Sequence, residues 1–304
     1  MLRTLPAPER LWRLPAALSI PLTVTLLSAC AMAPVHTEGP ARKETAVAVT
    51  ASNQLIRFNV GQPGRILSRT ALSGLQPGES VLGIDFRIAK GQLFALGSSG
   101  RLYRVDAASG AAVAVGAPIA MTLSGEEFGV DFNPAVDRLR VVGNTGLNLR
   151  LHPDTGAVVD GNPALDGTQP DAPLAYVAGD PNAGKTPSVV AAAYTYNKTN
   201  EKITTNYVID AAAGTLAMQG SLEGATPVVS PNTGQLRTVG PLGAGVFKTA
   251  AFDIADVSGA AFAALTPAGA SASRWVEIDL KSGVAKSLGT IGGGEAVRGA
   301  AIEP

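Results

Sequence analysis

Apolar residues after position 45 fall into short runs that are separated by turn signals. The clearest series comprises Val81–Arg87, Gln92–Gly97, Arg101–Asp106 and Ala111–Gly116. A Lys-Gly pair and two Ser-Gly pairs stand between these runs, and glycine supplies the positive φ that a tight hairpin needs. No window of ten or more residues shows sustained helical periodicity. The pattern therefore predicts an all-β domain of short antiparallel strands.

The same four-strand phrase recurs along the chain, and it opens on a strand of the type Gly-Ile-Asp-Phe. The expected opening strands are Val81–Arg87, Phe128–Phe132, Leu174–Gly179, Thr249–Ile254 and Val297–Ile302. Their starts are evenly spaced except for one longer interval, in which we interpret Met218–Val246 as an insertion. A regular internal period of this length is typical of repeat architectures such as propellers.

The fifth opening strand has no chain left to complete its repeat, and the missing strands stand at the other end. Thr45–Ala51, Leu55–Asn59 and Ile66–Leu72 fill the second, third and fourth places of a repeat that lacks its first. One C-terminal strand and three N-terminal strands would close a ring and leave only short, protected edges. We therefore predict a five-bladed β-propeller. Two alternatives stay open: six blades, if the insertion supplies an incomplete one, and a β-sandwich.

The N-terminus has the pattern of an export signal. Arg3, Arg10 and Arg13 form a basic region, and the apolar stretch from 14 to 27 is too short to cross a bilayer as a helix. It ends in Leu-Ser-Ala followed by Cys30, the only cysteine of the chain. This ending resembles the bacterial lipobox, in which the cysteine is lipidated and becomes the first residue. We expect no disulfide within the chain.

These features predict three segments. Residues 1–29 are expected to be a lipoprotein signal peptide, residues 30–44 a tether that starts at lipidated Cys30, and residues 45–304 a single propeller domain. More than one acyl chain would hold the protein stably on a membrane. Ala31 follows the cysteine instead of an aspartate, which implies the outer membrane, facing the periplasm, as the destination.

Charge argues against nucleic acid as a partner. The chain has 24 basic and 24 acidic residues; removing residues 1–29 takes away three arginines and one glutamate, which leaves 21 and 23. A slightly negative mature protein lacks the basic footprint of a nucleic-acid-binding domain. The expected partners are the membrane, through the lipid anchor, and an unidentified protein or small ligand.

The sequences of the repeats resemble those of a known family. Five segments carry the likeness: VLGIDFR from Val81, FGVDFNP from Phe128, AYVAGDPNAG from Ala175, TVGPLG from Thr238 and VRG from Val297. They are similar to the bacterial domain-of-unknown-function family 4394, over roughly residues 46–303. The resemblance implies an exported, propeller-like domain and brings no known activity or catalytic residues.

Two motifs suggest chemistry that their context contradicts. Residues 179–186 read GDPNAGKT, a literal phosphate-loop match, but Pro187 and the strand-like Val189–Tyr194 follow where a helix is needed. We therefore expect no nucleotide binding. His152 is the only histidine of the expected domain and stands beside a Pro-Asp-Thr-Gly turn, so we interpret it as a turn residue instead of a catalytic base.

Three aspartates are the remaining candidates for chemistry. Asp85, Asp131 and Asp253 hold the same place in three opening strands, and Ala178 and Ala301 hold it in the other two. Opening strands line a propeller channel, so the three carboxylates are expected to approach one another there. Oxygen ligands suit a hard cation such as Ca²⁺. The favoured alternative is that each carboxylate accepts hydrogen bonds from N–H groups of a neighbouring hairpin, with no cofactor.

These observations favour a non-enzymatic binding or interaction module over an enzyme. The alternative is a hydrolase or lactonase-like enzyme that uses a cation held by Asp85, Asp131 and Asp253 in the channel. No catalytic residue is assigned.

Overall fold

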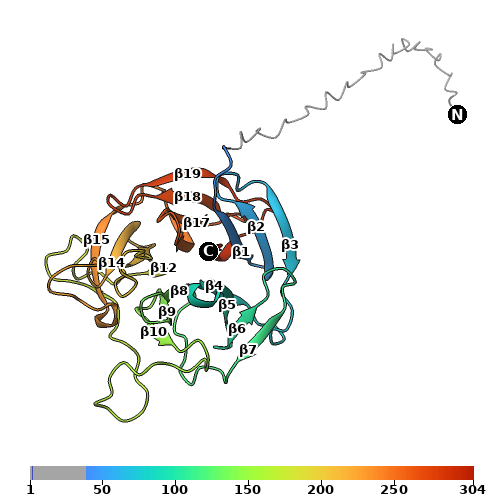
Figure 1. The fold of residues 1–304 in the computed structure, drawn as a ribbon. Coiled ribbons are helices and arrows are strands. Elements are labelled where there is room, and N and C mark those ends of the chain that lie inside the picture. Colours follow the sequence, from blue (N-terminus) through green and yellow to red (C-terminus); the bar gives the residue numbers. More distant parts are fainter. Residues whose placement is uncertain (1, 3–38) are drawn as a thin grey trace. The chain divides into compact units, whose positions relative to one another are not determined.

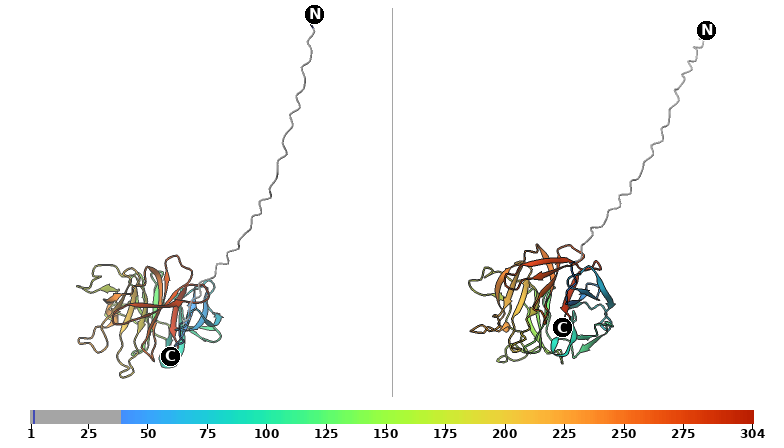
Figure 2. Two further views of the ribbon diagram at one scale, coloured as in Figure 1. Left: turned by 90° about the horizontal axis from the view of Figure 1, so that it is seen from above. Right: turned by 45° about the horizontal axis from the view of Figure 1, so that its top comes forward.

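The computed structural model describes Leu2 and residues 39–304. The expected signal peptide and the lipidation site Cys30 lie outside the described residues. Five β-sheets stand around a central axis like the blades of a propeller (Figure 1). Figure 2 shows this ring from two further sides. The all-β class and the five-bladed architecture predicted from the sequence are confirmed.

The ring closes by pairing the two ends of the domain. Blade 1 has the order β20-β1-β2-β3, from Val297–Ile302, Thr45–Thr50, Gln54–Asn59 and Ile66–Ala71. Strand β20 pairs antiparallel with β1, and Ala48 faces Ala300 in the register. One C-terminal strand and three N-terminal strands therefore form one blade, as predicted.

Blades 2 and 5 are regular four-stranded meanders. Blade 2 consists of β4 (Val81–Arg87), β5 (Gln92–Gly97), β6 (Leu102–Val105) and β7 (Ala112–Val115). Blade 5 consists of β16 (Phe247–Ile254), β17 (Ala261–Pro267), β18 (Arg274–Ile278) and β19 (Ala285–Thr290). In both blades the first strand lies next to the axis and the last at the rim (Figure 1).

Blades 3 and 4 depart from that plan. Blade 3 has only β8 (Phe128–Asn133), β9 (Arg138–Gly143) and β10 (Asn148–Leu151) as regular strands. Blade 4 has the order β12-β13-β14-β15-β11, from Val189–Tyr194, Asn206–Asp210, Thr215–Gln219, Gln235–Pro241 and Ala175–Tyr176. The 3-10 turns η1 (Ile88–Lys90) and η2 (Pro231–Thr233) complete the elements.

The predicted opening strand of blade 4 was wrong. The segment Leu174–Gly179 contains only β11, which lies at the opposite edge of the blade and pairs parallel with β15. The inner strand is β12, and all six of its residues are buried. The family-like phrase around Ala175 imitates an opening strand, whereas the true one, VVAAAY, has neither its glycine nor its aspartate.

The predicted insertion was wrong as well. Met218–Val246 includes β15, which is an ordinary fourth strand paired with β14, so it supplies no sixth blade. The additional chain instead lies between β10 and β12, where only the short strand β11 forms. This long segment takes the place of a regular fourth strand in blade 3.

Small residues let the inner strands approach one another closely at the axis. A Cβ on Gly83 would lie 2.7 Å from a Val130 methyl, and one on Gly129 would lie 2.4 Å from the Ala192 nitrogen. Real Cβ atoms essentially never come this close to a neighbour. The glycine of the repeated Gly-Ile-Asp-Phe phrase is therefore explained by packing of one blade against the next.

Apolar side chains fill the spaces between the blades. Trp275 of blade 5 is fully buried, stacks on Phe262 at 5.8 Å between ring centroids, and meets the edge of Phe58 from blade 1 at 5.0 Å. Burying an aromatic side chain of this size is a large hydrophobic contribution to holding two blades together.

The end of the expected tether lies on the propeller. The Arg42 guanidinium makes two hydrogen bonds of 2.8 Å to the carboxylate of Glu277 on β18, and its main-chain N–H donates to the Asn59 side chain. The Gln62 amide donates to the Gly39 carbonyl oxygen. Residues 39–44 are thus held by blades 1 and 5. Among the described residues, no helix is long and apolar enough to cross a membrane.

Candidate functional sites

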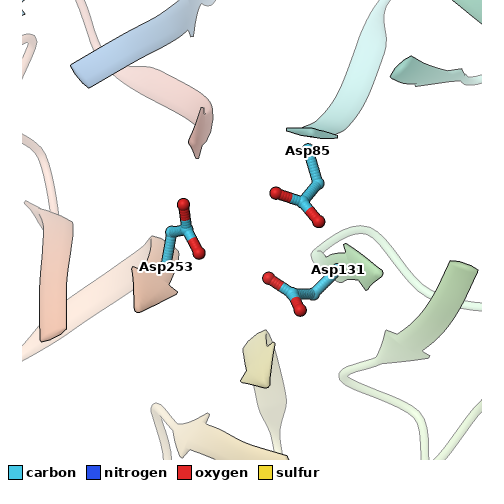
Figure 3. Close-up of side chains that lie close together, drawn as sticks. All are labelled: Asp85, Asp131 and Asp253. Atoms are coloured by element: carbon cyan, nitrogen blue, oxygen red, sulfur yellow. The ribbon is translucent and has the colours of Figure 1, made fainter. Parts of the chain in front are cut away.

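Three aspartates from three blades meet at the axis. Asp85 lies on β4, Asp131 on β8 and Asp253 on β16, and all three are buried. One carboxylate oxygen of each lies within 4.8 Å of those of the others, and Figure 3 shows the three groups pointing toward one another. The approach expected from their equivalent places in the repeat is therefore observed. A cation at this place remains a prediction.

Each of these carboxylates also accepts a hydrogen bond from the main chain of the next blade. The donor is always the N–H that follows the equivalent position of that blade's inner strand. The pairs are Asp85 with Phe132 (2.6 Å), Asp131 with Tyr194 (2.9 Å) and Asp253 with Ile302 (2.5 Å). The sequence had suggested N–H groups of neighbouring hairpins as the donors. The donors instead belong to inner strands. The carboxylates thus join neighbouring blades directly.

Two blades have alanine at the equivalent position. These residues are Ala301 on β20, as expected, and Ala193 on β12 in place of the expected Ala178. Ala193 offers no side-chain acceptor to blade 5. The N–H of Ile254 in that blade instead donates to Asp253 of its own strand, at 2.6 Å.

Ala301 precedes blade 2 around the ring and offers no side-chain acceptor to it. The three aspartates therefore accept from four inner-strand N–H groups at one level of the ring. A buried N–H without an acceptor is costly, so this arrangement explains the three aspartates without any ligand.

Burial raises the pKa of all three carboxyl groups, and repulsion between carboxylates raises it further for Asp85 and Asp131. Loss of solvation is the largest cause in each case. The charge of Asp253 further raises the pKa of Asp85 and of Asp131, whereas the pKa of Asp253 itself rises to about 6. The cluster therefore retains protons at a pH where free aspartate has lost them. A protonated member can then donate a hydrogen bond to an ionised neighbour.

A small cavity lies between the inner strands that carry the carboxylates. Its volume is about 10 Å³, and residues such as Gly83, Gly129 and Gly299 line it. A space of this size holds about one water molecule. The cluster can share protons or hold a bare cation, but this cavity has no room for an organic substrate.

The two other motifs of the sequence have the local structure expected of them. Residues 179–186 form turns, followed by strand β12 and not by a helix. The carboxylate of Asp180 accepts from the N–H groups of Asn182 and Thr238, and the Lys185 amine donates to the Asn182 side chain. His152 lies in the turn after β10, and its Nδ1 accepts from the Asp154 N–H. Absence of nucleotide binding remains a prediction.

A larger cavity, which the sequence did not reveal, opens between blades 3 and 4. Its volume is about 300 Å³, at the lower end of the range of small-molecule sites. It lies where β8 and β12 end, and the loop that carries η2 forms part of its wall. Three of its lining residues are arginines: Arg138, Arg140 and Arg150. We call this cavity the arginine pocket.

Arg140 is the buried centre of this pocket, with an exposed fraction of 1%. Its Nη1 donates to Asp171 at 2.6 Å and to the Asn148 side chain at 2.8 Å. Its Nε donates to the Tyr194 hydroxyl at 3.1 Å, and its Nη2 donates to the Asn232 side chain at 2.6 Å. Four partners from separate segments therefore fix one guanidinium beside an open cavity.

A second arginine shares the same carboxylate. Arg150 donates from Nε and Nη2 to the two oxygens of Asp171, at 2.8 and 2.7 Å, and the Asp171 side chain is fully buried. No protein acceptor among the described residues meets the Arg150 Nη1 atom. One buried carboxylate thus balances two guanidinium groups, and Arg138 adds a third positive charge at the pocket wall.

The only sequence signal for this pocket is a pair of arginines within a strand. Arg138 and Arg140 alternate in RLRVVG, so they share one face of β9. Arginine on a blade face that should be buried indicates a polar partner. That partner, Asp171, is 31 residues away in an irregular segment, which no local pattern connects to β9.

These features define the class of the protein: a five-bladed β-propeller closed by its C-terminal strand, with carboxylates at the axis. A family model described as "Domain of unknown function (DUF4394)" matches residues 54–301. The chain belongs to this family, as the phrases in its repeats predicted. The matched segment includes the three axial aspartates and the three arginines of the pocket. A comparison with curated proteins finds no match in sequence.

Two solved structures match this chain at low sequence identity and with TM-scores under 0.5. A crystal structure of a nidogen/laminin complex has 11% identity and a TM-score of 0.43, over 86% of this chain and 98% of that chain. A structural genomics protein of unknown function from Bacteroides thetaiotaomicron VPI-5482 has 16% identity and a TM-score of 0.45, over 81% of this chain and 58% of that chain. Neither likeness bears on function.

Proposed function

We propose that this chain is a lipid-anchored protein of the bacterial cell envelope whose propeller binds a small polar ligand without chemically changing it. The anchor rests on the export signal and on Cys30 at the place that a lipobox requires. The favoured location is the outer membrane, facing the periplasm. The binding site is the arginine pocket between blades 3 and 4.

One contrast supports binding over catalysis. The axial carboxylates, which are the candidate cation ligands of an enzyme, already accept main-chain N–H groups, and the cavity between their strands measures only about 10 Å³. The arginine pocket has about 300 Å³ and polar groups held in fixed positions. A hydrolase or lactonase-like enzyme working in the channel would need a route by which its substrate reaches the axis. A ligand can reach the arginine pocket directly, because the pocket opens between blades 3 and 4.

Ligand screening with a blocked pocket tests this proposal. The full-length protein, purified in detergent, is melted with sugars, amino acids, organic acids and nucleosides. A compound that binds the folded state raises Tm, and it should be recovered intact afterwards. Val136 lines the pocket and is 57% exposed, so Val136→Trp should fill the entrance and abolish the shift.

The matched control for that variant lies in another blade. Val257 stands in the β16–β17 turn, which corresponds to the β8–β9 turn of Val136, and it is 68% exposed. Val257→Trp should leave the shift unchanged. A compound that is consumed, or a shift that both variants retain, would contradict binding at this pocket. Separately, Cys30→Ala should move the protein from the membrane to the soluble or unprocessed fraction; unchanged fatty-acid incorporation would contradict the anchor.

A further inference from the structure

We infer that the ligand of the arginine pocket is a small organic acid, bound through a carboxylate by Arg140 and Arg150. This inference rests on the proposed binding function and specifies the chemistry of its ligand. It starts from the position of two guanidinium groups on one buried carboxylate, beside a cavity of about 300 Å³.

The charge of the pocket is unbalanced. Arg140 and Arg150 both bond to Asp171, so one negative charge faces two positive ones. Arg138 lines the same wall and donates only to the carbonyl oxygens of Val136 and Asp137. A buried arginine keeps its charge because its pKa lies far above neutral. An anion in the cavity would reduce this excess of positive charge and compensate the guanidinium groups for the solvation that burial removes.

Donors remain available for such an anion. The Arg150 Nη1 group has no acceptor among the described residues, and the Arg140 Nη2 group, which carries two hydrogens, donates only to Asn232. Both arginines line the same cavity, and guanidinium donors give a carboxylate short, charge-assisted hydrogen bonds.

The surroundings of Arg140 resemble a prepared site more than a stabilising core. Asn148 accepts from Arg140 and also from Gln219 at 3.0 Å, and the Asn206 side chain donates to Gln219 at 3.0 Å. A buried polar network of this kind is seldom more stable than apolar residues of equal volume. What it does supply is a guanidinium that does not have to reorganise when a ligand arrives.

In the described part of the chain, two other cavities of similar volume lack a buried charged side chain. These cavities, of about 400 and 300 Å³, lie along blade 2 and share the side chain of Arg104. Arg104 is exposed, and among the described residues no buried charged side chain lines either cavity. The combination of enclosed volume, buried cation and unused donors therefore points to the arginine pocket.

Matched acid and amide probes test this inference. Succinate and citrate should raise the Tm of the full-length protein, whereas succinamide should not. Arg150→Gln should weaken succinate binding at least about tenfold, which is the effect of losing one charge-assisted hydrogen bond. Arg138→Gln, which breaks only contacts to carbonyl oxygens of its own turn, should weaken it less and leave the fold intact. Arg274→Gln removes an exposed arginine from blade 5 and should have no effect.

The outcomes separate this inference from the proposed function. If succinamide binds as well as succinate and Val136→Trp abolishes both, the pocket binds ligands but not because of their charge, and the inference is wrong. If inorganic phosphate binds and no carboxylic acid does, the pocket takes an anion of another class, and the inference is wrong in its ligand. If neither acids nor any neutral compound of the wider screen binds, the proposed function is wrong as well.

Discussion

The axial cluster and the arginine pocket both bury charge, but they use it differently. At the axis, three carboxylates accept four main-chain N–H groups of inner strands, and the cavity between these strands has room for about one water molecule. In the pocket, side chains hold a guanidinium beside about 300 Å³ of open space. The difference suggests that buried charge indicates a ligand site only where donors or acceptors remain unused.

The strongest test of this comparison uses pH, because burial raises the pKa of the axial carboxyl groups, whereas the arginines of the pocket keep their charge. Burial raises the pKa of Asp253 to about 6, and partial burial next to Asp253 raises that of Asp256 to about 7. The folded protein therefore binds these protons more tightly than the unfolded chain does. Their stabilising effect is complete below the unfolded pKa, near 4, and is lost as the pH rises through about 6 to 7.

The expected loss of stability from Asp253 alone is about 2 kcal/mol between pH 4.5 and pH 7.5. Urea midpoints at the two pH values measure it, and Asp253→Asn should flatten the slope. Succinate affinity should change little over the same interval, because the arginines stay charged. A stability that rises with pH, or a slope that Asp253→Asn leaves intact, would show that the axial carboxyls are ionised throughout.

A smaller effect is expected from removing one axial acceptor. Asp131→Ala leaves the Tyr194 N–H buried without its partner and should destabilise the protein by about 1–3 kcal/mol. Asp131→Asn should be milder, because the amide oxygen can still accept. Arg138→Gln in the pocket should change stability by no more than about 0.5 kcal/mol. Denaturant titration checks all three variants. The comparison breaks if Arg138→Gln destabilises more than Asp131→Ala.

The repeats made most of the fold predictable from the sequence. Hairpin signals and the recurring Gly-Ile-Asp-Phe phrase located the inner strands of blades 1, 2, 3 and 5, and the orphan strand at 297–302 indicated how the ring closes. Blade 4 failed because its inner strand meets the same packing demand with alanines. Small side chains fit the crowded axis, but a run of alanines is not a recognisable sequence motif.

The axial cluster and the arginine pocket also differ in how far the sequence predicts them. The axial aspartates could be found because equivalent repeat positions converge on the axis by symmetry. The pocket could not, because it depends on segments that the repeat does not govern. Arg140 meets Asn232 across 92 residues, and that contact needs the irregular chain of blade 3 and the η2 loop of blade 4. Local patterns carry no information about such a meeting.

The smallest expected effect concerns the predicted cation site at Asp85, Asp131 and Asp253. Three carboxylates within 4.8 Å could bind Ca²⁺ if they were ionised and free to coordinate. Their oxygens instead accept main-chain N–H groups, and raised pKa values keep protons in the cluster. A cation would therefore have to displace protons and compete with the hydrogen bonds that join the blades.

We accordingly expect Ca²⁺ to leave the Tm of the chelator-treated protein unchanged at pH 7.5. A ligand of the folded state would instead raise stability by RT ln(1 + [L]/Kd), so a titration to millimolar Ca²⁺ would detect even weak binding.

The decisive variant is Asp85→Asn combined with Asp131→Asn, which removes two ligand charges but keeps acceptor oxygens for Phe132 and Tyr194. Asp279→Asn, in a hairpin turn, controls for calcium at exposed carboxylates. A calcium-dependent shift that persists in Asp279→Asn and vanishes in the double variant would make the axis a metal centre.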